Sequence, residues 1–378
     1  MSLLKNDSLV CNEVKNSVIA WSQDQKETTE IHHAFLDYHK FILRKWIFMI
    51  SCLVVAVIVT GVALTIGDVK IGFFGSYETL WNHIIGNIEN KTYDYIITEL
   101  RLPRIVTGII AGAGLAVAGV AMQSILKNPL ADPYTTGVSS GAGFGATMAI
   151  TMGASVTTGQ YAIVINAFIF SLIPTIVILS VAKMKNASPT VMIMAGIAVM
   201  YIFNAMTTVM KLWADPNDLA AVFQWQVGTL SSADWPDIYL MLPVTIAGVI
   251  AVWILSKKLN VLATGDESAK ALGVDADQLR MICMILVALI SATIVSFTGL
   301  IGFVGLVAPH VVRLFIGSDN RYLVPASALF GSALLITADL VGRTIIAPTV
   351  LQVGVITAFL GGPLFLWLIV RRKEEIWG

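Results

Sequence analysis

Long apolar stretches separated by short polar connections run along the chain from Trp46 almost to its C-terminus. Stretches of about 20 apolar residues cross the ~30 Å of hydrocarbon in a bilayer. Ten are expected, at residues 46–66, 105–125, 136–155, 161–182, 190–210, 238–256, 279–298, 300–316, 323–342 and 350–370. The pattern is weakest in the third, which Gly and Ser dilute, and in the eighth, which Gly and Pro interrupt. The pattern predicts an all-α polytopic membrane protein with ten transmembrane helices.

A polar segment precedes these spans. Residues 1–45 carry charges every few positions and lack the apolar core and small-residue cleavage site of a secretory signal. His32, His33 and His39 lie close together here. A solvated tail or a short amphipathic helix on the membrane is a better interpretation than metal binding, because no other ligand set accompanies them. We expect a polar cytosolic extension at 1–45, of open role, and a transmembrane domain at 46–374.

Composition supports the membrane assignment. Of 378 residues, 56% are hydrophobic and 13% are charged, and the mean hydropathy is +0.79. Globular domains carry about 25% charged residues. The 24 basic and 24 acidic residues balance, which gives no support for nucleic-acid binding. Cys11, Cys52 and Cys283 are scattered, so disulfides and a zinc site are not expected.

The distribution of Lys and Arg predicts the orientation. With the N-terminus in the cytosol and ten alternating spans, 15 Lys and Arg residues from Lys40 onward fall on inner segments and 6 on outer ones. Cytoplasmic loops of membrane proteins carry an excess of Lys and Arg. The bias therefore favours ten spans with both termini in the cytosol.

Small residues predict close helix packing. Two neighbouring spans carry them four positions apart: Gly108, Gly112 and Ala116 in the first, and Gly137, Gly141 and Gly145 in the second. Helix association in lipid depends on van der Waals contact, which small residues allow. We expect a tightly packed bundle.

Ionisable groups are nearly absent from the span centres, where an ion-coupled transporter or membrane enzyme would place them. Asp339 lies four residues before Arg343, a spacing that allows a pair along one helix. His310 follows Pro309 in the Gly-rich stretch 299–310, where a helix break satisfied by neighbours is favoured over catalysis. The motifs HExxH, GxSxG and GxxxxGK[ST] do not occur. If the protein uses ATP, another polypeptide must bind it.

Two polar islands flank the second span. Arg101-Leu102-Pro103-Arg104 precedes it on the outer side, where a proline that ends any preceding helix would hold two cations in a rigid, outward-facing site. Membrane anchoring and docking of a partner are equally good interpretations. On the inner side, Pro129 and Pro133 exclude a continuous helix and predict a stiff turn, either a connector or a gate.

A third island is the cytosolic loop 259–280. A short helix fits between Gly265 and Gly273, with acidic residues at its N-terminal end. Ala269 and Leu272 would form an apolar face three residues apart. An apolar face exposed to the cytosol needs a partner, and a protein suits it better than anionic lipid, because the helix starts with acids.

Several long motifs resemble one family. RLPR, GAGLAVAGVAMQSILKNPLADPYTTGVSSGAGFGA, GDESAKALGV, GLIGFVGLVAPHVVRLFIG, ADLVGRTIIAP and LGGPLFLWLIVRR occur in this order within 46–373. They are similar to permease subunits of the ABC importers for ferric siderophores, haem and cobalamin. The resemblance implies a type II ABC importer architecture with two permease subunits, the second a copy or a paralogue. It also implies two cytosolic ATPases that hold ATP and Mg, and an extracytoplasmic protein that delivers a metal chelate.

The resemblance also implies roles for individual residues. Arg101, Arg104 and Arg343 match cations that dock the delivery protein, and reversing the charge of the first two is expected to weaken docking without unfolding the bundle. The cytoplasmic gate matches Asn128, Leu130 and Thr190, although Pro189 departs from the family pattern. The helix that couples to the ATPase matches the loop residues Asp266, Glu267, Ala269, Leu272 and Gly273. Gly-Asp-Glu stands there where the family often has Gly-Glu. No catalytic or metal-binding residue is implied.

The sequence therefore predicts a permease in a prokaryotic cell membrane that imports an iron chelate, with cobalamin as the alternative ligand. It is not expected to be an enzyme itself. An ion-coupled secondary transporter would require central carboxylates or unwound helix pairs. A receptor or structural membrane protein would not need the exposed loop 265–273. The sequence leaves open both the ligand and whether the second permease subunit is identical to the first.

Overall fold

The computed structural model describes residues 39–184 and 188–371, all of them in helices, turns or connecting segments. The chain divides into two compact units, Met1–Phe48 and Met49–Gly378. The first is described only from His39 onward, where it begins the helix His39–Thr65. His32 and His33 lie outside the described residues, as does Cys11. The second unit contains the rest of that helix and every described helix after it.

Each expected span coincides with an observed helix. The first is His39–Thr65, and the others are α4 (Leu102–Ile125), α5 (Val138–Met152), α6 (Ala162–Met184), α7 (Pro189–Leu212), α9 (Trp235–Ala263), α11 (Ala276–Thr298), α12 (Val304–Ile316), α13 (Asn320–Thr344) and α14 (Val353–Arg371). Within the described residues, seven helices are long and apolar enough to cross a membrane. Two of the shorter ones, α5 with 15 residues and α12 with 13, are the third and eighth spans, where the pattern is weakest.

Short elements occupy the connections. They are α2 (Phe73–Ile85), α3 (Lys91–Tyr95), the π-helix η1 (Ile96–Arg101), the 3₁₀ helix η2 (Pro133–Thr136), α8 (Pro216–Val227) and α10 (Asp266–Ala271). Of these short elements, the sequence predicted only α10, from the glycines on either side of it and the acidic residues at its start.

Pro103 does not end the helix that precedes it, contrary to the expectation from sequence. The chain is helical without a break from Lys91 to Ile125. Residues 96–101 form the π-helix η1, and the N–H of Leu102 donates to the carbonyl of Ile97, five residues back. Proline lacks an N–H and its ring crowds the preceding turn. The wider π turn accommodates Pro103, which is the second residue of α4.

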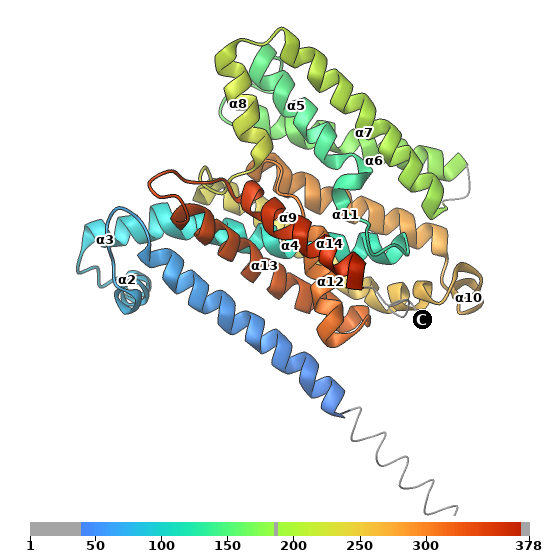
Figure 1. Ribbon diagram of the computed structural model, residues 1–378, viewed down its shortest axis with the longest axis horizontal. Coiled ribbons are helices and arrows are strands. Elements are labelled where there is room, and N and C mark those ends of the chain that lie inside the picture. Colours follow the sequence, from blue (N-terminus) through green and yellow to red (C-terminus); the bar gives the residue numbers. More distant parts are fainter. Residues whose placement is uncertain (1–38, 185–187, 372–378) are drawn as a thin grey trace, which may run out of the picture. The chain divides into compact units, whose positions relative to one another are not determined.

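Helix α4 forms the centre of the unit. It is buried at 19 of its 24 residues, and it packs against α9, α11, α12 and α13. A second group, α5 to α8, packs mainly on itself and meets the first group through α11 (Figure 1). The segments α2 and α3 lie at the end of the unit opposite α10. Helix α4 is buried almost all round. It follows η1 at one end, and at its other end the next turn contacts α10 through Lys127 and Asp266.

The small residues allow backbones to touch, as expected. A Cβ at Gly112 would lie 2.3 Å from the carbonyl oxygen of Gly331, and one at Gly119 would lie 1.8 Å from that of Gly305. In α5, a Cβ at Gly145 would lie 2.5 Å from the carbonyl oxygen of Asn166. Contacts this short confirm the prediction of a tightly packed bundle.

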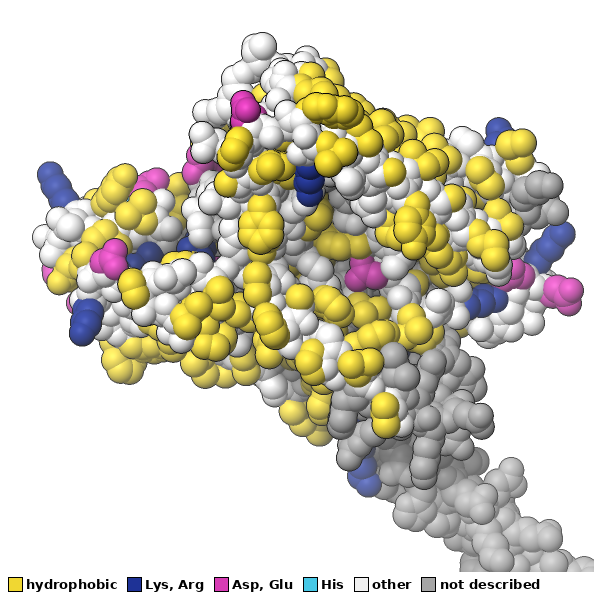
Figure 2. All heavy atoms as spheres, turned by 45° about the horizontal axis from the view of Figure 1, so that its top comes forward, with side chains coloured by type: hydrophobic (Ala, Val, Ile, Leu, Met, Phe, Trp, Pro, Cys, Tyr) yellow, Lys and Arg dark blue, Asp and Glu magenta, His cyan; other side chains and the backbone are white. Residues whose placement is uncertain are grey.

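The surface suits a lipid environment. Hydrophobic and uncharged side chains cover most of the face in Figure 2, and most charged side chains lie towards its left and right ends. Large apolar side chains such as Tyr239, Trp253 and Ile254 are more than half exposed on α9. An exposed apolar area of this kind requires a nonpolar environment.

The helical structure is interrupted between α11 and α12, and neighbouring groups hydrogen-bond to the backbone N–H and carbonyl groups that this frees, as the Gly-rich stretch predicts. Phe303 adopts a left-handed conformation with φ of 68°. The carbonyl of Thr298 accepts from the N–H of Thr229 at 2.7 Å, and the N–H of Ile301 donates to the Tyr134 hydroxyl at 3.1 Å. The break lies at 299–303, and Pro309 is inside α12.

Candidate functional site

Arg104 and Arg343 meet at the N-terminal end of α4 around Asp339 of α13. The Arg104 guanidinium makes a bidentate pair with this carboxylate, with Nε 3.0 Å from both oxygens and Nη2 2.8 Å from Oδ1. Nε of Arg343 lies 3.1 Å from Oδ2 of Asp339. The pairing of Asp339 with Arg343 along one helix is therefore confirmed, and Arg104 joins it from another helix.

Arg101 lies beside this cluster and is buried, with 8% of its surface exposed. Its guanidinium donates to the carbonyls of Leu64 and of Val69, the latter at 2.6 Å. Arg343 donates to the carbonyl of Ala63 at 3.3 Å. The arginines thus fasten the segment between the first span and α2. The expectation of a rigid, outward-facing pair of cations is wrong for the structure described, because both side chains turn inward to backbone and carboxylate acceptors.

The charges of this cluster do not cancel. Arg343 lies within electrostatic range of Arg101 and Arg104 as like charges, and of Asp339 as the opposite charge. Asp68 is a second acid near Arg101. Three cations face two carboxylates, so these five residues together carry one more positive than negative charge.

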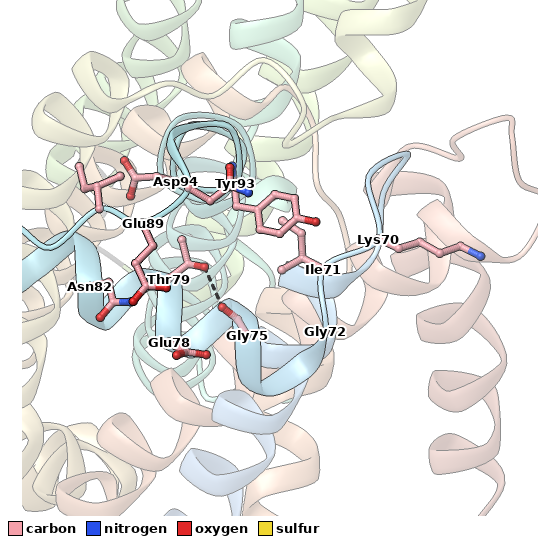
Figure 3. Close-up of a pocket in the computed structure, with 12 residues that line it drawn as sticks. Lys70, Ile71, Gly72, Gly75, Glu78, Thr79, Asn82, Glu89, Tyr93 and Asp94 are labelled. Atoms are coloured by element: carbon pink, nitrogen blue, oxygen red, sulfur yellow. Dashed lines mark hydrogen bonds between the residues drawn. The ribbon is translucent and has the colours of Figure 1, made fainter.

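A polar pocket of about 350 Å³ opens between α2 and the segment that leads into α3 (Figure 3). Glu78, Asn82 and Glu89 line it, and Lys70 lies at its edge. Asp94 also lines it but pairs with His83 at 2.8 Å. No group of three His, Cys, Asp or Glu residues close enough to hold a metal ion occurs among the residues described.

At the other end of α4, two of the three gate residues predicted from sequence, Asn128 and Leu130, lie in a tight turn. Lys127 has a left-handed conformation with φ of 49°, and the N–H of Asn128 donates to the Gln123 carbonyl at 3.1 Å. This arrangement closes the end of the helix. The Asn128 side chain accepts from the N–H of Leu130 at 2.9 Å, which leaves the Leu130 side chain 41% exposed. The stiff turn predicted from the two prolines is confirmed.

The turn ends on a partly buried carboxylate. Asp132 caps η2, and its Oδ1 accepts from the N–H of Tyr134 at 2.7 Å. Burial raises the pKa of Asp132 to about 6. A carboxyl group with this pKa changes its charge near physiological pH, and sequence reasoning did not identify it.

Thr190 lies on a different helix, in the first turn of α7, and is exposed. Pro189 is the first residue of α7, where its missing N–H costs nothing, and the Ser188 side chain accepts from the N–H of Val191 at 3.3 Å. Helix α7 packs on η2 further along, where a Cβ at Gly196 would lie 2.9 Å from the Thr135 carbonyl oxygen. Thr190 thus belongs to a helix that touches the element following the turn.

The short helix expected in the 259–280 loop is confirmed as α10, which follows Gly265 and ends before Leu272. The expected apolar face is divided between two environments. Ala269 is fully buried within the chain, whereas Leu272 is 67% exposed. Glu267 is exposed in the first turn, and Gly273 has a φ of 79°, which terminates the helix. Ala269 therefore anchors α10, and the Leu272 side chain stays exposed in the chain described.

Asp266 joins α10 to the end of α4. Its Oδ1 accepts from Lys127 Nζ at 2.8 Å and from Arg280 Nη2 at 2.6 Å. Hydrogen bonding by Arg280, and then by Lys127, lowers the pKa of Asp266. Arg280 is 1% exposed, and its Nε donates to the carbonyl of Ile125 at 3.1 Å. Sequence reasoning treated Lys127 and Arg280 only as inner cations, because they are far from Asp266 along the chain.

Comparisons with known proteins agree with this architecture. The FecCD transport family matches residues 52–371. A hemin transport system permease protein of Yersinia pestis is 36% identical over 321 residues, which cover 83% of this chain and 94% of that protein. A cobalamin import system permease protein of Halobacterium salinarum is 38% identical over 284 residues, 75% of each chain.

A solved structure has the same fold. It is described as an inward-facing conformation of a metal-chelate type ABC transporter, and it superimposes with a TM-score of 0.76 at 27% sequence identity. The alignment covers 86% of this chain and 99% of that chain. The match extends over nearly all of the transmembrane region.

Proposed function

Because the chain belongs to the FecCD transport family of ABC transporter permeases, we propose that it is the membrane subunit of an importer for an iron chelate, a ferric siderophore or haem. The observation that supports this ligand class most is the extended similarity to a hemin permease, together with the shared fold of a metal-chelate transporter. Cobalamin is the second candidate, because a cobalamin permease is similar over three quarters of the chain.

We infer that the α2–α3 end of the unit faces outward and the α10 end faces the cytosol, with both termini inside. The excess of Lys and Arg on the α10 side supports this orientation. The two ends carry different chemistry: a cluster with surplus positive charge on one and an exposed Leu272 beside acidic residues on the other. These ends suit different partners.

On the cytosolic side, the complete importer would contain two ATPase subunits, one of which would bind α10 of this chain. The ATPase subunits would hold ATP and Mg. Leu272 and Glu267 are exposed there, and Ala269 fixes α10 to the bundle. A second permease subunit, a copy or a paralogue, would complete the pathway. ATP shifts the conformation only if the ATPases contact α10 differently in the two states. This chain performs no covalent chemistry.

On the outer side, an extracytoplasmic binding protein would deliver the chelate to the arginine cluster. Acidic groups on that protein would compete with Asp339 for Arg104 and Arg343, and the surplus positive charge favours their approach. Because Arg101 is buried, we expect the charge reversals Arg101→Glu and Arg104→Glu to lower thermal stability as well as docking affinity. A pull-down together with a melting curve separates the two effects, with Lys91→Glu as the control.

Transport in proteoliposomes tests the proposed function. The chain, reconstituted with its ATPase subunits and binding protein, is expected to accumulate ⁵⁵Fe-labelled ferric chelate or haem only when ATP is present. Uptake of labelled cobalamin in place of iron would select the second candidate. Uptake driven by an ion gradient in the absence of ATP would contradict the importer assignment.

A further inference from the structure

We propose that Lys127, Asp266 and Arg280 form a mechanical link that carries the movement of α10 to the gate turn, residues 126–133. This inference rests on the proposed function, because it assumes that α10 receives force from an ATPase. The roles that the family resemblance implies for single residues include neither Lys127 nor Arg280. The link is defined by contacts between three segments: the end of α4, α10 and the start of α11.

Arg280 is the centre of the link. It is almost completely buried, and its three kinds of donor reach three different places: Nε to the Ile125 carbonyl, Nη2 to Asp266, and Nη1 to Asp277 at 3.3 Å. A buried guanidinium is costly unless it is paired and fully hydrogen-bonded. Removing the Asp266 contact would leave the buried cation with the exposed Asp277 as its remaining acid. Arg280 therefore resists separation of α10 from the last residue of α4.

Lys127 connects the same carboxylate to the gate. Its Nζ lies 2.8 Å from the Asp266 oxygen that Arg280 also contacts, and Lys127 directly precedes Asn128. The Lys127 backbone is held in a left-handed conformation, so the direction of the following turn depends on this residue. A displacement of Asp266 therefore acts on the helix end through Arg280 and on the gate turn through Lys127.

The link is stiffer than an ordinary surface ion pair. An exposed pair contributes little to stability and is screened by salt. Here one carboxylate receives two cations, and one of these cations is buried and also bound to backbone. The planar guanidinium fixes the geometry, which a Lys ammonium would not reproduce. This arrangement transmits direction as well as force.

Uncoupling of hydrolysis from uptake tests the link. Lys127→Gln, Asp266→Asn and Arg280→Lys are each measured in the reconstituted complex for ATPase binding, ATP hydrolysis and ⁵⁵Fe-chelate uptake. In Lys127→Gln and Arg280→Lys, which lie outside α10, we expect bound ATPase and hydrolysis within about twofold of the unmodified protein, and uptake per ATP reduced tenfold or more. In Asp266→Asn, which lies in α10 itself, we expect only that uptake per ATP falls tenfold or more. Lys258→Gln, an exposed inner cation on α9, is the matched control and is expected to keep the normal ratio.

A second measurement does not depend on transport. Hydrogen exchange of residues 126–133 in the purified chain is expected to accelerate at least fivefold in Lys127→Gln and Asp266→Asn, but not in Lys258→Gln. Unchanged exchange in the two variants, an unchanged uptake-to-hydrolysis ratio, or loss of ATPase binding in both Lys127→Gln and Arg280→Lys would each overturn the link. If the unmodified complex imports no iron chelate but the exchange result holds, the ligand assignment fails and the link stands.

Discussion

At the scale of single residues, the contact between Gly119 of α4 and Gly305 of α12 shows how closely the helices approach. A Cβ at position 119 would lie 1.8 Å from the Gly305 carbonyl oxygen, which is far too close for two non-bonded atoms. Backbone atoms cannot move away as a flexible side chain can. The sequence indicates a small residue here, but only the fold shows what it touches.

Substituting Gly119 by Ala is therefore expected to destabilise the protein by more than about 3 kcal/mol, because helices α4 and α12 must separate. Thermal unfolding in detergent would show a lowered midpoint. The control is Gly143→Ala in α5, where the nearest atom to a Cβ is 3.7 Å away and helix propensity favours Ala. A midpoint equal for both variants would contradict the close-packing argument.

A second prediction at this scale concerns Asp132, whose pKa burial raises to about 6. The folded protein holds this proton more tightly than the unfolded chain, so the stabilisation is complete below about pH 4 and is lost as the pH rises through 6. Asp132→Asn keeps an acceptor for the N–H of Tyr134 and carries no charge. We expect this variant to lose this part of the pH dependence. At pH values above 7, its melting temperature should be higher than that of the unmodified protein.

The measurement is a set of melting curves between pH 4 and 8. Asp215→Asn, at an exposed acid before α8, serves as the control and is expected to leave the profile unchanged. A parallel pH profile for Asp132→Asn and the unmodified chain would show that Asp132 does not titrate in this range.

At the scale of elements, α10 shows that a helix can be fixed by very few contacts. Six residues are too few for a helix that is stable by itself in water. The buried Ala269 and the ion pairs of Asp266 hold it against the bundle, and Gly273 ends it. Leu272 projects beyond this anchored part, so its role can be tested without disturbing the fold.

Leu272→Asp is expected to reduce ATPase binding and transport at least tenfold, because it places a charge in a proposed apolar contact. The unfolding midpoint should stay within about 2 °C, since Leu272 is mostly exposed. Leu272→Met keeps the apolar surface and is the matched control. Normal uptake by Leu272→Asp would remove α10 from the proposed ATPase contact.

At the scale of the whole molecule, α4 joins the two proposed partner surfaces. Its N-terminal end carries the arginine cluster around Asp339, and its C-terminal end carries the proposed gate turn and the link to α10. Because α4 is buried along its length and closely packed, it cannot bend easily between these ends. A movement at one end is therefore expected to shift the helices around α4 as a group.

The orientation of the molecule gives a prediction at the same scale. Single cysteines replacing the exposed Glu89 and Lys258 lie at opposite ends of the unit. In a background where Cys11, Cys52 and Cys283 are replaced by Ser or Ala, a membrane-impermeant maleimide is expected to label only the cysteine at 89 in intact cells. Labelling at 258 but not at 89 would reverse the proposed topology.

The hydrophobic pattern alone predicted the number and approximate positions of the membrane helices, because long apolar runs favour lipid, although α5 and α12 are shorter than 20 residues. The Gly spacings predicted that these helices pack closely. The turn at Pro129 and Pro133 and the helix at α10 followed from local backbone preferences. Tertiary structure alone decided that Arg101 turns inward, that Pro103 lies within a continuous helix, and that Asp266 meets Lys127 and Arg280. Side-chain direction and long-range charge pairing depend on which helices become neighbours, and no local pattern specifies that.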